Sequence, residues 1–109
     1  MKSVNTAQHP PVLGDMIDKL QSWPAVRRIY LFGSRARGDN QERSDIDLAV
    51  EAPTATDDQW VEMRLAAEDA YTLLTIDLVR LDDASDEFRQ RIFAEGKLLY
   101  ERPGSATNA

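Results

Sequence analysis

The sequence predicts a single α+β domain in which a small mixed β-sheet is covered by helices on one face. Three observations lead to this fold class. The chain has 109 residues, which is the length of one domain. Hydrophobic residues make up 42% of it, which excludes the composition of a disordered chain. Segments with helical and strand periodicity follow one another in the order helix, strand, strand, helix, strand, helix, strand.

The first half of the chain contains one helix and two strands. Apolar residues at helical spacing predict a helix over residues 11–22, and Pro24 ends it. β-branched and aromatic residues predict a strand over residues 26–32, which Gly33 interrupts. The stretch "DIDLAVE", residues 45–51, predicts a second strand with apolar residues on one face and aspartates on the other.

The second half of the chain contains two helices and two strands. A long helix is expected over residues 57–73, followed by a strand over residues 75–81. Ser85 is a suitable N-cap for the next helix, and Gly96 lies just past its end. Residues 97–101 predict a short last strand. In this arrangement the sheet face opposite the helices is left open.

The organisation of the chain is simple. Residues 1–10 are expected to be a flexible N-terminus, residues 11–102 the folded domain and residues 103–109 a disordered tail. The chain has no cysteine, which excludes disulfides and thiolate metal sites and fits a reducing compartment. It has neither a signal-peptide apolar region nor a stretch long enough to span a bilayer. A protein of the cytoplasm with no membrane partner is therefore expected.

The charge of the chain is unevenly distributed. The formal net charge is −6, which disfavours stable binding to nucleic acid, because such binding requires cations to neutralise phosphates. Residues 27–43, however, contain five arginines and two acidic residues, an excess of +3. A small cationic region on an acidic protein fits a compact anion such as a nucleotide. A solvated arginine-rich loop is the alternative interpretation.

Three aspartates lie on strand faces. Asp45 and Asp47 point the same way along one predicted strand, and Asp77 lies on another. Carboxylates packed together repel one another unless a cation joins them. Mg²⁺ prefers hard oxygen ligands, so the three residues predict a magnesium site, with two ions in a two-metal arrangement. The alternative is a set of exposed strand carboxylates that bind no metal.

The turn after the first strand has the features of a phosphate-binding turn. Gly33 allows the backbone to approach an anion closely, and a helical turn that starts at Ser34 would offer its N–H groups and hydroxyl. Arg35, Arg37 and Arg43 would add positive charge. Such a turn next to a carboxylate cluster predicts phosphoryl or nucleotidyl transfer, in which positioning and electrostatics supply most of the catalysis.

The spacing of these motifs is more specific than either motif alone. Gly33-Ser34, ten residues, then Asp45-Ile46-Asp47 resembles the signature of the DNA polymerase β-like nucleotidyltransferase superfamily. The stretches "LFGSRARG", "RSDIDLAV" and "FRQRIFAEGKLLYE" are similar to its minimal nucleotidyltransferase (MNT) branch. The resemblance covers residues 12–102 and implies the polymerase β-like fold.

The resemblance also implies roles for individual residues. Gly33 and Ser34 would bind the triphosphate of the nucleotide. Asp45 and Asp47 would hold Mg²⁺, and Asp77 would be the third acidic residue, serving the metal near the nucleophile or accepting its proton. These three aspartates are the expected catalytic residues.

The MNT branch further implies a partner. The chain is expected to transfer NMP, from ATP as AMP, to a hydroxyl, foremost a tyrosine of a HEPN-domain toxin encoded beside it. It would then be the antitoxin of a type VII-like HEPN/MNT pair and form a hetero-oligomer with the toxin. Two alternatives stay open: an antitoxin that only occludes its HEPN partner, and a nucleotidyltransferase that modifies a small molecule of the aminoglycoside type.

Overall fold

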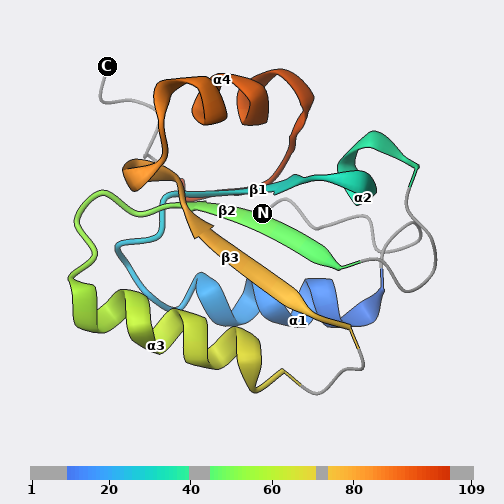
Figure 1. Ribbon diagram of the computed structural model, residues 1–109. Coiled ribbons are helices and arrows are strands. Elements are labelled where there is room, and N and C mark those ends of the chain that lie inside the picture. The colour runs from blue at the N-terminus through green and yellow to red at the C-terminus, as the bar shows by residue number, and fades with distance from the viewer. Residues whose placement is uncertain (1–9, 40–44, 71–73, 104–109) are drawn as a thin grey trace.

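The computed structural model describes residues 10–39, 45–70 and 74–103, which form an α+β fold (Figure 1). Its elements are, in chain order, α1 (Pro11–Leu20), β1 (Arg28–Phe32), α2 (Ser34–Arg37), β2 (Ile46–Glu51), α3 (Asp57–Glu68), β3 (Ile76–Arg80), the 3₁₀-helix η2 (Leu81–Asp83), α4 (Asp86–Glu95) and β4 (Lys97–Glu101). The predicted order of helices and strands is confirmed. The long helix expected over residues 57–73 is shorter than predicted, because α3 ends at Glu68 with Asp69 as its C-cap. The predictions for residues 1–9, 71–73 and 104–109 fall outside the described residues.

The four strands form one mixed sheet in the order β3-β2-β1-β4. β1 is antiparallel to both β2 and β4, whereas β2 and β3 are parallel. β3 and β4 are therefore the two edge strands. The register places Asp47 opposite Phe32 of β1 on one side and opposite Asp77 of β3 on the other. The sheet thus brings together residues that are 30 positions apart in the chain.

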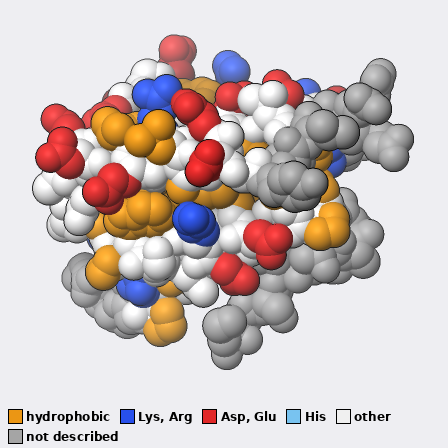
Figure 2. All heavy atoms as spheres, turned by 90° about the horizontal axis from the view of Figure 1, so that it is seen from below, with side chains coloured by type: hydrophobic (Ala, Val, Ile, Leu, Met, Phe, Trp, Pro, Cys, Tyr) orange, Lys and Arg blue, Asp and Glu red, His pale blue; other side chains and the backbone are white. Residues whose placement is uncertain are grey.

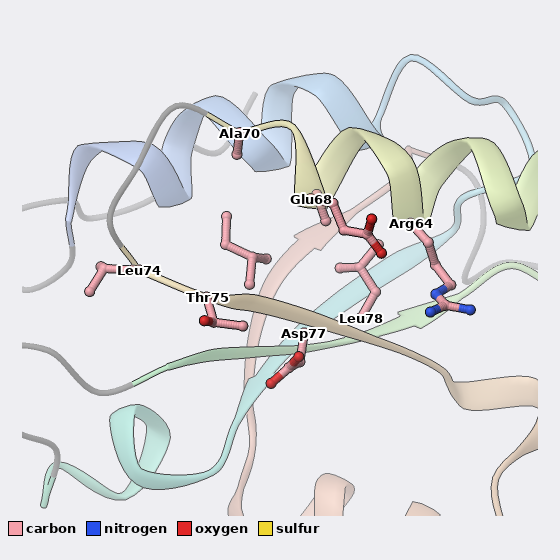
Figure 3. Close-up of a pocket in the computed structure, with 9 residues that line it drawn as sticks. Arg64, Glu68, Ala70, Leu74, Thr75, Asp77 and Leu78 are labelled. Carbon is pink, nitrogen blue, oxygen red and sulfur yellow. The ribbon is translucent and has the colours of Figure 1, made fainter.

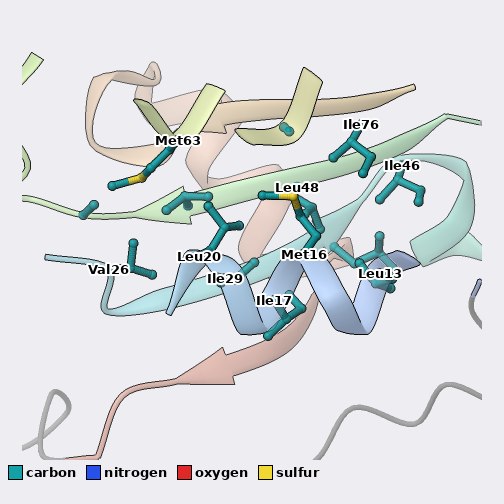
Figure 4. Close-up of a cluster of buried hydrophobic side chains, with 14 of the residues drawn as sticks. Leu13, Met16, Ile17, Leu20, Val26, Ile29, Ile46, Leu48, Met63 and Ile76 are labelled. Carbon is teal, nitrogen blue, oxygen red and sulfur yellow. The ribbon is translucent and has the colours of Figure 1, made fainter. Parts of the chain in front are cut away.

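The main core lies between one face of the sheet and the helices α1 and α3 (Figure 4). α1 contributes residues at the spacing of a single helix face, and the strands contribute every second residue. The fully buried side chains include Leu13, Leu20, Ile29, Leu48 and Met63. These apolar contacts fix the positions of β1 and β2, from which the polar residues of the opposite face project.

Residues at the helix N-termini set where α3 and α4 begin. The Ser85 hydroxyl accepts a hydrogen bond from the Phe88 backbone N–H at 3.2 Å, which confirms Ser85 as the N-cap of α4. α3 has a capping box that the sequence analysis did not identify. The Thr56 hydroxyl accepts from the Gln59 N–H, and the Gln59 side chain accepts from the Thr56 N–H, both at 3.1 Å.

The prediction that helices cover only one face of the sheet is wrong. α4 lies on the face opposite α1 and α3 (Figure 1). A second, smaller core forms there, containing the buried residues Ala49, Leu81 and Ile92. Phe32 and Phe88 pack edge to face next to it, with ring centroids 5.5 Å apart. Side chains of this face are apolar along part of β1 and β2, and α4 covers that part.

The outer surface of α1 and α3 is mixed in character. Figure 2 shows the molecule from the side of these helices, where acidic side chains lie beside hydrophobic ones. Val61 and Leu65 of α3 are 52% and 56% exposed.

Within the described residues, no helix has the length and apolar composition needed to cross a membrane.

Arg102 fixes the end of the domain to the segment between α1 and β1. Its Nε donates to the Val26 carbonyl at 2.8 Å, and its Nη2 donates to the Gln21 and Trp23 carbonyls at 2.9 and 3.0 Å. Its backbone N–H donates to the Arg27 carbonyl at 2.8 Å. Arg102 therefore joins the chain after β4 to the segment between α1 and β1.

Substitution of Arg102 by alanine is expected to lower the free energy of unfolding by about 2 kcal/mol, because three partly buried carbonyls lose a charged donor. Urea unfolding would measure this change. Arg102→Lys should recover only part of it, since an ammonium group lacks the planar fork that reaches several carbonyls at once. An alanine variant as stable as the unsubstituted protein would contradict this role.

Candidate active site

The turn between β1 and α2 has the backbone conformation that the sequence analysis expected of it. Gly33 has φ 77° and ψ −157°, and the helical turn α2 begins at Ser34. The N–H groups of Ala36 and Arg37 both donate to the Gly33 carbonyl at 3.1 Å. Gly38, with φ 85°, ends the turn. The chain therefore makes one tight turn of helix between two glycines that adopt positive φ.

Gly33 lies directly against the carboxylate of Asp47. A Cβ added to Gly33 would lie 2.4 Å from Asp47 Oδ2, closer than any real side chain allows. The cause is the antiparallel register, which pairs Phe32 at the end of β1 with Asp47 of β2. The predicted phosphate-binding turn and the predicted metal-binding carboxylate are thus in contact.

Asp45, Asp47 and Asp77 gather at one end of the sheet. Asp47 and Asp77 are paired across the parallel strands β2 and β3, so their side chains leave the same face. Asp45 precedes β2 by one residue. Asp45 and Asp77 are exposed, and Asp47 is half-buried. The sheet therefore places two carboxylates next to each other and the third two residues away.

The electrostatic environment of Asp47 shows that these charges interact. Burial raises the pKa of Asp47 above its ordinary value, and the charges of Asp77 and Asp45 raise this pKa further. The Arg37 guanidinium lowers the pKa of Asp47 but does not offset the other effects. The protein therefore does not fully offset the free-energy cost of ionising Asp47.

The residues fit Mg²⁺ by the chemistry of their donors. Asp45 and Asp47 supply hard carboxylate oxygens, and the unfavourable charge at Asp47 is the kind that a divalent cation relieves. The expected convergence of all three carboxylates on one point is not present, however: in the part of the chain that the structure describes, no three acidic or histidine side chains form a ready metal site. Magnesium commonly uses one or two carboxylates and completes its shell with water and substrate phosphates.

The three arginines expected to bind nucleotide differ in their placement. Arg37 is half-exposed and forms an ion pair with Asp39 at 3.2 Å. Arg35 is only 8% exposed, so its side chain is directed into the protein rather than toward a nucleotide in solvent. Of these two arginines, Arg37 is therefore the one whose side chain is accessible to a nucleotide. Arg43 lies outside the described residues.

A cation that the sequence analysis did not identify lies near the turn. A hollow of about 210 Å³ is lined by Gly33, Arg37, Phe88 and Arg91 among others. Arg91 belongs to α4, which reaches this place because it packs on the second face of the sheet. The sequence contained no signal for it, since "FRQRIF" indicates an exposed helix position but not what lies across from it.

Asp77 also lines a second hollow, of about 400 Å³, between α3 and β3 (Figure 3). Arg64 and Glu68 extend into it from α3, and it is also lined by Thr75, just before β3, and by Leu78 of β3. In Figure 3 Asp77 points away from α3, toward the face of the sheet on which α4 packs. Asp77 thus lies between the carboxylates of β2 and a space at the edge of the sheet.

The raised pKa of Asp47 predicts how stability depends on pH. The folded protein holds the Asp47 proton more tightly than the unfolded chain, so this group favours folding most at low pH. Its contribution is lost as pH rises from the ordinary value of 3.8 through the raised pKa of the folded state. Asp47→Asn should therefore be more stable than the unsubstituted protein at about pH 7, and this difference should shrink at about pH 4.

Urea unfolding at the two pH values, without divalent cations, measures this difference. Addition of Mg²⁺ at the higher pH should stabilise the unsubstituted protein more than the variant. A variant that is less stable than the unsubstituted protein at the higher pH would show that Asp47 has a favourable partner when ionised.

Sequence comparison identifies relatives of this chain. The profile described as "Polymerase beta, Nucleotidyltransferase" matches residues 15–104. The protein adenylyltransferase MntA of Shewanella oneidensis is 37% identical over 103 residues, which cover 92% of this chain and 68% of the relative. The matched region contains every residue of the site described above.

Structural comparison agrees with this result. A crystal structure of a toxin–antitoxin with AMP-PNP has a TM-score of 0.65 and 34% sequence identity, covering 82% of this chain and 73% of its own. A structure of a tri-AMPylated Shewanella oneidensis HEPN toxin in complex with MNT antitoxin has a TM-score of 0.55 and 32% sequence identity. The match covers 81% of this chain and 69% of the other.

A nucleotidyltransferase structure from Sulfolobus solfataricus, at 21% identity, shares the fold with a TM-score of 0.58 and covers 84% of this chain and 78% of its own. The fold, the matched profile and the identity to MntA all agree. The chain belongs to the polymerase beta nucleotidyltransferase family.

Proposed function

We propose that this chain is a protein adenylyltransferase that transfers AMP from ATP to a tyrosine hydroxyl of a HEPN-domain toxin, and that it acts as the antitoxin of that toxin. The observation that carries the proposal is the contact between the Gly33 turn and Asp47, which is itself paired with Asp77. The names of the relatives support it, since one is a protein adenylyltransferase and another is the antitoxin bound to an AMPylated HEPN toxin.

The Gly33 turn would bind the triphosphate of ATP. With no Cβ at Gly33, phosphate oxygens can approach the backbone, and the first N–H groups of a helical turn have no partner within the helix. The Ser34 hydroxyl would add a further hydrogen bond. Arg37 and Arg91, which line the hollow beside Gly33 together with Glu95, would supply positive charge.

Asp45 and Asp47 would hold Mg²⁺, which when bound would neutralise charge that develops on the phosphates. In the transfer, the acceptor hydroxyl oxygen forms a bond to the α-phosphorus of ATP. The bond from this phosphorus to the oxygen that bridges to the β-phosphate breaks, and pyrophosphate leaves. Asp77 is exposed and lies beside Asp47, so its carboxylate would accept the proton of the acceptor hydroxyl.

The test is a labelling assay with the protein, Mg²⁺ and the HEPN-domain protein encoded by the neighbouring gene. ATP labelled at the α-phosphate should label the HEPN protein, and ATP labelled at the γ-phosphate should not. Label from the γ-phosphate alone would show a kinase-like phosphoryl transfer instead. Absence of label from both, with a stable complex still formed, would show that the chain neutralises its partner by binding.

The absence of cysteine fits the reducing cytoplasm in which such a pair would act.

A further inference from the structure

A groove follows the outer edge of β3, starting at Asp77. Its first part is the hollow of about 400 Å³ between α3 and residues 74–78 (Figure 3). Its second part, of about 630 Å³, continues along residues 78–80 toward α4. Arg64 and Leu78 line both parts, so the two adjoin.

The groove exposes the backbone of β3 and not one of its faces. Side chains of consecutive residues alternate between the two faces of a strand, so a hollow lined by five consecutive residues runs along the strand's edge. The Thr75 carbonyl accepts from the Ile46 N–H at 2.8 Å, which directs the backbone groups of every second residue from Thr75 toward β2. The N–H and C=O groups of Ile76, Leu78 and Arg80 therefore point to the other side of β3, away from β2. Among the described strands, none pairs with β3 on that side.

The walls of the groove have a defined chemistry. Trp60, Leu78, Val79 and Phe88 provide apolar surface along its second part. The exposed Arg64 at the junction forms no ion pair with any residue that the structure describes. The groove thus combines a row of backbone hydrogen-bonding groups and apolar walls with charged residues of both signs, Arg64 and Arg80 against Glu68 and Asp83. Arg80 is paired with Asp57 and Asp83, so Arg64 is the cation of this lining that has no ion pair with a described residue. The groove leads to a carboxylate of the proposed active site.

We propose that the acceptor segment of the partner protein binds along β3 in extended conformation, as an added strand, and so brings its hydroxyl to Asp77. This inference rests on the proposed function and names how that same site recognises its protein substrate. An added strand forms main-chain hydrogen bonds with the edge and places alternate side chains on each face. The acceptor side chain would lie on the face of Asp77, and its chain neighbours would face α3, where Arg64 favours an acidic residue.

The first test measures the KM for each substrate in AMP transfer from α-labelled ATP to the HEPN partner. Arg64→Glu should raise the KM for the partner by about tenfold or more and leave the KM for ATP within about twofold, because Arg64 lies in the groove and away from the Gly33 turn. Lys97→Glu is the matched control, since it reverses the same charge on the exposed, opposite edge strand β4 and should change neither constant. A partner KM for Arg64→Glu within about twofold of the unsubstituted value would overturn the proposal.

The second test does not depend on catalysis. Hydrogen exchange at the amides of Ile76, Leu78 and Arg80 should slow when the HEPN partner is bound, and exchange along β4 should not change. Slowing at β3 in a complex that transfers no AMP would retain the docking mode and overturn the enzymatic function. Unchanged exchange at β3 in a complex that does transfer AMP would overturn the docking mode alone.

Discussion

Replacement of Gly33 by alanine is expected to reduce the rate of AMP transfer by about 100-fold or more in a protein that still folds. The added Cβ would lie 2.4 Å from Asp47 Oδ2, so either the turn or the carboxylate must move. The backbone angles of Gly33, φ 77° and ψ −157°, belong to a region that other residues avoid, at a cost of about 1–3 kcal/mol. A displacement of about 1 Å is enough to cost two orders of magnitude in rate.

Gly38→Ala provides the matched control for this variant. Gly38 also has a positive φ, of 85°, but a Cβ added there meets nothing within 4 Å. Its replacement should cost about 1 kcal/mol in stability through backbone strain and change the transfer rate little. Thermal unfolding and the rate of label transfer, measured on both variants, separate the two effects. Equal losses of rate in both would show that backbone strain, and not the contact with Asp47, is responsible.

The double substitution Asp45→Asn/Asp47→Asn is expected to abolish AMP transfer, by about 1,000-fold or more, without loss of stability. Asparagine keeps the shape of the side chain and removes the charge that would hold Mg²⁺. Burial, and then the charges of Asp77 and Asp45, raise the pKa of Asp47 in the folded state, so removal of the Asp45 and Asp47 charges relieves an unfavourable interaction in the folded protein. Binding of the HEPN partner should persist, because the groove along β3 contains neither residue.

Label transfer, complex formation and survival of cells that express the toxin would be measured for this variant. Asp18→Asn, an exposed change on α1, is the control for the loss of a carboxylate at the surface. A double variant that forms the complex but fails to neutralise the toxin would establish neutralisation by modification. Full neutralisation without transfer would assign it to occlusion, the alternative that the sequence analysis left open.

Much of the fold could be predicted because its signals are local. Periodicity located the helices and strands, and Ser85 marked the start of α4 through its own hydroxyl. The face on which α4 packs could not be predicted in this way. An apolar stripe such as that of Phe88 and Ile92 shows that a helix covers something, but both faces of this sheet offer apolar residues.

The candidate site shows the same division. The spacing of Gly33-Ser34 and Asp45-Asp47 indicated a turn and a strand that meet, and the register of β1 and β2 brings them into contact. The burial of Arg35 and the approach of Arg91 depend on tertiary packing. No local pattern distinguishes an arginine that faces a ligand from one that faces the protein.

The two halves of the proposed site lie on separate segments of the chain. The turn and carboxylates proposed for ATP and Mg²⁺ belong to the hairpin of β1 and β2, whereas the groove belongs mainly to α3 and β3. The pairing of β2 with β3, which sets Asp47 beside Asp77, joins them at the proposed reacting centre. Under this proposal, substitutions in α3, or in β3 at positions other than Asp77, would change which protein is modified while the nucleotide chemistry stays intact. Such a division lets an antitoxin follow the divergence of its toxin without rebuilding its catalytic machinery.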